Sequence, residues 1–235
     1  DLLLLSDPGA FFEELLKVKE ILAGKFESSW LEKHLQMRKT WVDETLLNLE
    51  SKTSRKSWQG GVIHPLQLAV DVMETMEDGN HLVFDGGNTH FWSEIAANVI
   101  AQQGKNLSTI MHPGSFSLLG LGVSFAVSLK RIHPQDNVVL ISGDGAFLSG
   151  GLSIELAFQE ELPIVVIVDN NGGLYCISQQ QERMFQSGSH FATDFRDIPF
   201  HDMFKGLGGY GELVTNRADI KSAVKRAINS GKPAC

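Results

Sequence analysis

Residues 137–173 read NVVLISGDGAFLSGGLSIELAFQEELPIVVIVDNNGG, and their pattern predicts the architecture of the chain. Two apolar, β-branched runs, at 137–142 and 163–169, flank a segment that has helical apolar spacing around residues 153–160. Near-continuous β-branched runs of this length are typical of strands that are buried on both faces of a sheet. Strand, helix and strand in this order predict two parallel strands joined by a helix.

The same alternation extends through most of the chain. Strands and helices that alternate in this way predict an α/β fold, a parallel sheet with helices on both faces. The expected helices are 64–76, 90–102 and 119–132, the expected strands are 81–85 and 108–112, and the segments 174–185, 201–208, 210–214 and 217–230 continue the alternation.

The first 50 residues follow a different, helical pattern. Asp7 and Pro8 predict the N-cap and first turn of a helix that reaches about Leu22, and residues 28–50 have helical apolar spacing. The polar, weakly patterned segment that follows is the best linker candidate. We therefore expect a helical end of another domain at 1–50, a linker at 51–61 and the α/β domain at 62–235.

Composition excludes several classes of protein. The chain carries 20 basic and 28 acidic residues without a Lys/Arg run, which argues against nucleic-acid and membrane partners. Two cysteines, Cys176 and Cys235, imply no disulfide framework and a reducing, cytoplasmic location. The chain opens with neither a signal peptide nor a membrane span, and it lacks an initiator Met. We expect it to be a fragment of a longer protein.

An aspartate and an asparagine follow the two strands of the opening stretch. Ligands of open parallel sheets bind at the carboxyl ends of strands, so Asp144 and Asn171 should lie close together there. A carboxylate, an amide oxygen and a backbone carbonyl are the hard oxygen ligands that Mg²⁺ or Ca²⁺ prefers. The backbone N–H groups of Gly145 and Ala146 could meet the phosphates of a ligand. Gly-Asp-Gly and Asn-Asn-Gly are also common turn formulas, but their joint spacing favours a metal–diphosphate site.

These residues resemble a known signature. Gly143-Asp144-Gly145 followed by Asn170-Asn171 resembles the thiamine-diphosphate motif of the decarboxylase and acetolactate synthase superfamily. VFDGGNTHFW at 83–92, LLGLGVSFAVSLK at 118–130 and SGKPAC at 230–235 resemble further segments of its C-terminal, pyrophosphate-binding domain. The resemblance extends from about residue 61 to 235, and residues 1–50 resemble the end of the central domain.

The resemblance implies roles for individual residues. Asp144, the Asn171 side chain and the carbonyl of Gly173 would ligate Mg²⁺, and the backbone of Gly145 and Ala146 would hold the diphosphate of thiamine diphosphate. Ala146 replaces a serine that is common in the family, which removes a hydroxyl but keeps the N–H. Further cofactor contacts are implied for Gly87, Asn88, Thr89, Gly143, Leu174 and Tyr175.

Two further residues are implied in the catalytic role of the cofactor. Leu119 corresponds to the apolar wedge that bends the cofactor, and Ser117 to the residue whose carbonyl accepts a hydrogen bond from the aminopyrimidine. The bent cofactor can deprotonate itself and act as an electron sink. In this family the glutamate of the proton relay lies in an N-terminal domain of the partner subunit. We therefore expect a homodimer or homotetramer, and a fragment that is inactive alone.

The resemblance leaves the reaction open between two branches. Decarboxylation and carboligation of 2-keto acids, as in acetolactate synthases, is our first expectation. The run 178–181, Ser-Gln-Gln-Gln, replaces their Arg-Gln-Trp-Gln, whereas 173–175 and 145–151 are closer to oxalyl-CoA decarboxylases and 2-hydroxyacyl-CoA lyases, which act on acyl-CoA substrates. A non-catalytic cofactor-binding module is a further alternative. Tyr175, Gln179 and Gln180 are candidate pocket residues.

Other chemistry receives little support from the sequence. No Gly-x-Gly-x-x-Gly follows the first strand, which disfavours a dinucleotide-binding domain. His90 and His112 lie near predicted strand ends on the cofactor side; we interpret both as structural histidines, and contact of His112 with the substrate is the alternative. Without His-x-x-x-His or Cys-x-x-Cys spacing, the sequence predicts no transition-metal site.

Overall fold

The computed structural model describes residues 7–19, 28–52, 63–185, 188 and 190–235. The chain forms two compact units, residues 1–46 and 47–235. The predicted linker at 51–61 lies outside the described residues, apart from 51 and 52. Within the described ranges, no helix has both the length and the apolar content that a membrane span requires.

The first unit contains α1 (Pro8–Lys17) and the beginning of α3 (Ser28–Lys52). The predicted start of α1 is confirmed, because the side chain of Asp7 accepts the N–H of Ala10 at 3.0 Å and Pro8 lies in the first turn. Helix α1 ends at Lys17, and the expected end near Leu22 lies outside the described residues. At Val18 the backbone leaves helical angles and its N–H closes the last turn on the Leu15 carbonyl at 3.2 Å. The helical spacing of 28–50 is confirmed by α3.

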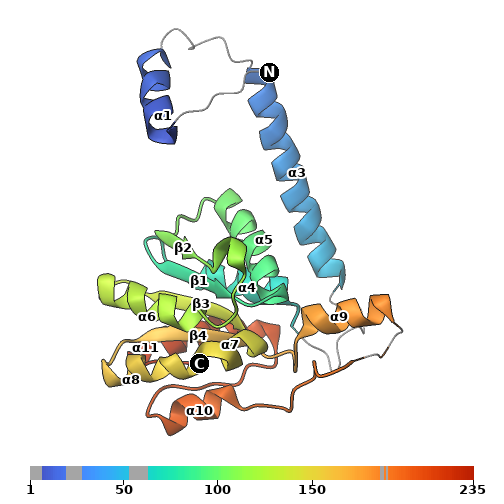
Figure 1. Cartoon of the computed structure of the whole chain (residues 1–235), viewed down its shortest axis with the longest axis vertical. Helices are drawn as coiled ribbons and strands as arrows, with labels where there is room; N and C mark the ends of the chain where they lie inside the picture. Colours follow the sequence, from blue (N-terminus) through green and yellow to red (C-terminus); the bar gives the residue numbers. More distant parts are fainter. Residues whose placement is uncertain (1–6, 20–27, 53–62, 186–187, 189) are drawn as a thin grey trace. The chain divides into compact units, whose positions relative to one another are not determined.

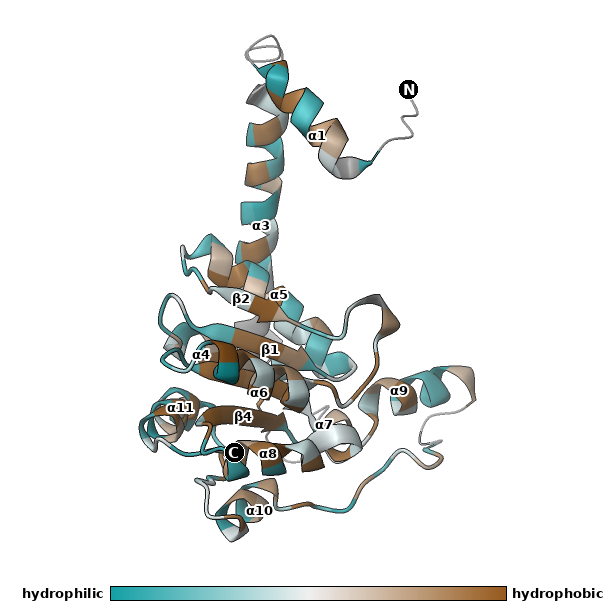
Figure 2. Ribbon diagram, turned by 60° about the vertical axis from the view of Figure 1, so that its left-hand side comes forward, coloured by the Kyte–Doolittle hydropathy of each residue, from teal (hydrophilic) through white to brown (hydrophobic). Residues whose placement is uncertain are grey.

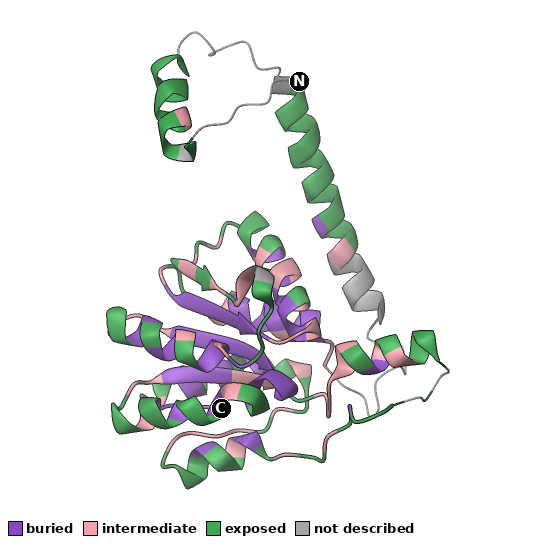
Figure 3. Ribbon diagram, in the orientation of Figure 1, coloured by how far each residue is buried: buried purple, intermediate pink, exposed green. Residues whose placement is uncertain are grey.

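The second unit is built on four parallel strands, β1 (His81–Asp85), β2 (Thr109–Met111), β3 (Val138–Gly143) and β4 (Ile164–Asp169). Their order in the sheet is β2-β1-β3-β4 (Figure 1). The register places Asp85 beside Ser142 and Gly143 beside Asp169, so the carboxyl ends of β1, β3 and β4 lie in one row. The predicted parallel sheet is confirmed; β1 and β3 are apolar and buried, β4 is largely so, and the edge strand β2 is more exposed (Figures 2 and 3).

Helices cover both faces of the sheet, as expected. Val138 and Leu140 point into one core, which is shared with Phe147 and Phe204. Side chains alternate along a strand, so Val139 and its neighbours face the opposite side. The helices of the first face are α6 (Gly122–Ile132), α7 (Asp144–Gly150), α8 (Glu155–Gln159) and α10 (Phe200–Gly206). Those of the second are α4 (Pro65–Thr75), α5 (Asn88–Gln102) and α11 (Ile220–Asn229), and α9 (Tyr175–Met184) follows the carboxyl end of β4.

The helix expected around 153–160 is confirmed by α8, but the connection from β3 to β4 also contains a further helix, α7. Helix α7 begins directly at Asp144, and a 3₁₀ turn at Gly151–Ile154 leads into α8. Glycine is a poor helix former, but here it permits close packing. A Cβ at Gly150 would collide with the carbonyl of Gly120, and one at Gly151 would lie 2.8 Å from the Phe147 ring. Tertiary packing therefore overrides helix propensity in α7.

In the described part of the chain, only isolated bridges extend the sheet beyond β4. Ala234 pairs with Val165 and with Tyr210, both in parallel. In the segment 210–214, Tyr210 bonds to Pro233 and Cys235, and Glu212 to Cys235. These few backbone hydrogen bonds form an isolated bridge, whereas the strand–helix alternation of the sequence predicted a regular strand or helix at 210–214.

Candidate functional site

The carboxylate of Asp144 joins the carboxyl ends of β3 and β4. Asp144 is the first residue of α7 and its side chain is buried. One carboxylate oxygen accepts the N–H of Gly145 at 2.7 Å. The other accepts the N–H groups of Gly172 and Gly173 at 2.8 and 2.9 Å. The structure therefore brings Asp144 and the segment around Asn171 together, as the strand order requires.

Asn171 supplies an oxygen without a hydrogen-bond partner. Its Oδ1 is buried and accepts no hydrogen bond from the described residues. Buried polar atoms nearly always have a partner, so an orphaned oxygen requires an explanation. A divalent cation between Asn171 and Asp144 would supply one. The carbonyl of Gly173 accepts the N–H of Tyr175 at 2.9 Å and keeps a second lone pair. These three oxygens fit the donor preference of Mg²⁺.

Burial raises the pKa of Asp144 above its ordinary value, although the N–H groups of Gly145, Gly173 and Gly172 oppose this shift. Burial also raises the pKa of Asp169 to about 6, the Thr89 hydroxyl opposes the shift, and the negative charge of Asp144 adds to it. The charge of Asp144 therefore disfavours the ionised form of Asp169 at the neighbouring strand end. A cation at this edge would relieve that repulsion.

Asp85 is a third buried carboxylate in the same row. It accepts N–H groups from Gly120 at 3.0 Å and from Gly122 at 2.7 Å. Burial raises its pKa, and the bonds from Gly122, Gly120 and Gly86 oppose the shift. Asp85 thereby holds the loop that carries Ser117 and Leu119. Neither Asp85 nor Asp169 was predicted as a site residue, although each ends a buried strand and precedes Gly or Asn.

The residues predicted for the cofactor ring lie on that loop. Ser117 has φ 48° and ψ 33°, the left-handed region, and its N–H bonds to the carbonyl of Gly114 at 3.0 Å. Leu119 is 37% exposed, so an apolar side chain remains open to a ligand at this position. These positions are compatible with the wedge and the carbonyl acceptor, which remain predictions.

The residues predicted for the diphosphate begin α5 and α7. Gly87 is the N-cap of α5, and Asn88 donates from its side chain to Gln179 of α9 at 3.3 Å. The hydroxyl of Thr89 donates to Asp169 at 2.9 Å, so a phosphate contact from Thr89 would come from its backbone N–H. Gly143, Gly145 and Ala146 lie at the buried start of α7.

The segment that leads into α9 closes against this start. The N–H of Leu174 donates to the carbonyl of Thr193 at 2.8 Å. A Cβ at Gly145 would lie 2.6 Å from the side chain of Leu174, which therefore occupies the space above Gly145. Tyr175 is half-buried at the start of α9, whereas Gln180 is exposed.

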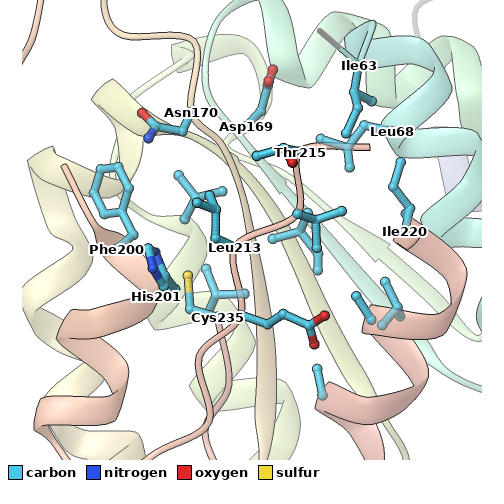
Figure 4. Close-up of a pocket in the computed structure, with 18 of the residues that line it drawn as sticks. Ile63, Leu68, Asp169, Asn170, Phe200, His201, Leu213, Thr215, Ile220 and Cys235 are labelled. Atoms are coloured by element: carbon cyan, nitrogen blue, oxygen red, sulfur yellow. The ribbon is translucent and has the colours of Figure 1, made fainter. Parts of the chain in front are cut away.

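A separate cavity of about 430 Å³ lies beside β4 (Figure 4). Asp169 and Asn170 line it together with apolar residues of α4 and α11 and the segment 210–215. Asp144, Asn171, Gly173 and Leu119 are not among its lining residues. The predicted cofactor residues therefore belong to the carboxyl edge of the sheet, not to this cavity.

Comparisons with known proteins point to the family that the sequence motifs resemble. Residues 85–235 match the family described as "Thiamine pyrophosphate enzyme, C-terminal TPP binding domain". The chain is similar to 2-hydroxyacyl-CoA lyase 2 of Mus musculus, with 28% identity over 234 residues, 97% of this chain and 34% of that protein. It is also similar to acetolactate synthase large subunit IlvG of Mycobacterium tuberculosis (strain ATCC 25618 / H37Rv), with 28% identity over 173 residues, 73% of this chain and 30% of that protein.

A third relative is 2-hydroxyacyl-CoA lyase of Oryza sativa subsp. japonica, with 26% identity over 204 residues, 81% of this chain and 33% of that protein. The chain thus spans about a third of the length of these relatives. The resemblance inferred from the Gly-Asp-Gly and Asn-Asn motifs is confirmed. The family match covers well over half of the chain, which therefore belongs to the thiamine pyrophosphate enzymes, as their C-terminal TPP binding domain.

Proposed function

We propose that this chain holds thiamine diphosphate and Mg²⁺ in an enzyme that cleaves or forms carbon–carbon bonds next to a carbonyl. The observation that carries the proposal is the buried Asp144 carboxylate, bonded to the turn after Asn171, whose own side-chain oxygen has no partner among the described residues. When bound, the cofactor supplies an electron sink beside the scissile bond. The chain would supply the metal ligands and the anchoring of the diphosphate.

Two substrate classes are supported by different features. Decarboxylation or carboligation of 2-keto acids is supported by the acetolactate synthase relative and by the signature residues. Action on an acyl-CoA substrate is supported by the two 2-hydroxyacyl-CoA lyase relatives and by Gln180, which stands where acetolactate synthases usually carry a tryptophan. Full-length protein assayed with pyruvate and with a 2-hydroxyacyl-CoA would distinguish the two classes.

We further propose an assembly of at least two subunits. The family resemblance assigns the proton-relay glutamate to an N-terminal domain of a partner subunit. The chain alone would then bind cofactor without turnover. The assignment of residues 1–50 to a central domain and the cytoplasmic location also remain predictions. Activity of the isolated chain would contradict the shared site.

Calorimetric titration of the chain with thiamine diphosphate, with and without Mg²⁺, tests the cofactor site. We expect Mg²⁺-dependent binding, and Asp144→Ala should weaken it by about 100-fold, because loss of a metal ligand costs at least as much as loss of the groups that support one. Asp202→Ala is the matched control, since it removes an exposed carboxylate on α10. Equal affinity of the wild type and Asp144→Ala would contradict the ligand assignment.

A further inference from the structure

Three side chains outside the predicted cofactor residues converge near the carboxyl ends of β1 and β2. His90 and Glu94 lie one turn apart on α5, and His112 directly follows β2. Their potential ligand atoms all lie within 4.8 Å of one another. His90 Nε2 is 3.1 Å from a carboxylate oxygen of Glu94, and the rings of His90 and His112 are 4.9 Å apart.

The cluster combines a fixed member with two accessible ones. His90 is buried, and its ring packs against the rings of Phe84 and Phe91. The side chain of Glu94 is 45% exposed, and His112 is exposed. An ion can therefore enter from solvent and meet an imidazole that the core already holds in place.

We propose that His90, Glu94 and His112 bind a first-row divalent transition ion, Zn²⁺ or its close analogues Co²⁺ and Ni²⁺. Two imidazole nitrogens and one carboxylate oxygen form a donor set that suits these ions and not Mg²⁺. Zinc sites with two histidines and one glutamate leave a fourth position for water or another ligand. The sequence spacing did not predict this site because its ligands come from two elements. The proposal does not depend on the proposed function.

A second histidine cluster at the other end of the sheet serves as a comparison. His81, His133 and Asp136 also lie within 4.8 Å of one another. Their two rings are stacked with centroids 4.3 Å apart and an angle of 29°, close to the 38° between the rings of His90 and His112, so ring orientation does not separate the two clusters. What distinguishes this cluster is the ammonium group of Lys130, which donates to the carbonyl of Asp136 at 2.8 Å and brings a positive charge that disfavours a cation there.

Binding would change one hydrogen bond that can be observed. His112 Nδ1 accepts the N–H of Gly114 at 3.1 Å, so the neutral ring carries its proton on Nε2. Ligation through Nε2 requires the proton to move to Nδ1, which can then no longer accept this bond. Gly114 has φ +67° and begins the 3₁₀ turn Gly114–Phe116. Its amide should therefore exchange with solvent faster when the ion is bound.

Titration of the tag-free chain with Co²⁺, in a large excess of Mg²⁺, tests the proposal by visible absorption. Mg²⁺ keeps the oxygen site at Asp144 filled, and four-coordinate Co²⁺ with nitrogen ligands absorbs far more strongly than octahedral Co²⁺ with oxygen ligands. We expect one strongly absorbing equivalent. Glu94→Gln and His112→Gln, both at accessible positions, should each weaken its binding by at least about tenfold. His133→Gln is the matched control and should bind like the wild type.

Each other outcome would overturn the proposal. Absence of a strongly absorbing equivalent would show that the three side chains do not assemble around an ion. Equal affinity of the wild type, Glu94→Gln and His112→Gln would place the ion elsewhere. A loss confined to His133→Gln would assign it to the other cluster. Circular dichroism of each variant shows that the fold is retained.

Discussion

Asp85 and Asp144 are two buried carboxylates that occupy similar positions in the sequence pattern but have different surroundings in the structure. Both lie where a buried strand ends, and both accept N–H groups from glycines of a distant loop. The described bonds around Asp85 close the 120–122 turn onto β1. Beside Asp144, the buried oxygen of Asn171 has no partner in the described part of the chain. One carboxylate completes the structure, and the other lies beside an oxygen that a cation would satisfy.

Substitution of Asp85 should have the largest effect on stability. Asp85→Ala removes the acceptor of the N–H groups of buried Gly120 and Gly122 and of half-buried Gly86. At roughly 1–3 kcal/mol for each orphaned donor, we expect a loss of about 4 kcal/mol in the free energy of unfolding. Urea denaturation measures this, and Asp85→Asn, which keeps one acceptor oxygen, should lose less. A loss below about 1 kcal/mol would contradict the structural role.

Asp169 should make stability depend on pH. Its pKa of about 6 lies above the ordinary value of 3.8, so the folded chain retains a proton that the unfolded chain releases. The contribution of Asp169 to the free energy of unfolding should therefore be greatest below pH 4. It should fall by up to about 3 kcal/mol as the pH rises towards 6. Urea denaturation without metal, from pH 4 to 8, measures this fall.

The matched variant is Asp169→Asn, which cannot ionise. Asp85 and Asp144 also have raised pKa values, so they contribute the same sign in both proteins. The difference between the two profiles isolates Asp169. Parallel profiles would show that Asp169 does not titrate in this range.

Asn171→Ala should separate stability from binding. Removal of a buried oxygen that has no partner should leave the metal-free chain as stable as the wild type, or more stable by about 1 kcal/mol. Mg²⁺-dependent binding of thiamine diphosphate should nevertheless fall sharply. Thermal unfolding and calorimetric titration of the same sample test both parts. A clear loss of stability with unchanged binding would make Asn171 a structural residue like Asp85.

Ser117 should give the smallest effect. Its φ of 48° lies in the region that favours glycine, so Ser117→Gly should retain stability or raise it by about 1 kcal/mol. Ser117→Val should lower it, because a β-branched residue is poorly tolerated there. Chemical denaturation of the two variants provides the measurement. The opposite order would show that the side chain of Ser117 makes a contact that outweighs the strain.

The sequence predicted the strands more reliably than the connections between them. The apolar run at 163–169 and its neighbours have few alternatives to buried parallel strands, and the sheet follows from them. Helix α7 could not be predicted from 144–150, because its glycines satisfy a tertiary contact that overrides their helix propensity. The same reasoning applies to 210–214, whose pairing depends on distant residues 233–235.

The candidate site, too, could be predicted from the sequence only in part. Strand ends and ligand chemistry were enough to place Asp144 beside the segment of Asn171. The pairing of Asp85 with Gly120 and Gly122, and of Thr89 with Asp169, joins residues more than thirty positions apart and becomes visible only in three dimensions. A polar residue at the end of a buried strand was a signal available for both aspartates.

The contact between Gly150 and Gly120 joins two segments at the carboxyl edge of the sheet, α7 and the loop that ends at Gly120. Helix α7 begins beside the predicted diphosphate residues, and the loop ending at Gly120 carries Leu119; backbone meets backbone with no side chain between them. A shift of α7 must therefore displace the loop that carries Leu119, so both ends of a long ligand would be held by one rigid unit. A methyl group at position 150 would push α7 and this loop apart, although the position is remote from any ligating atom.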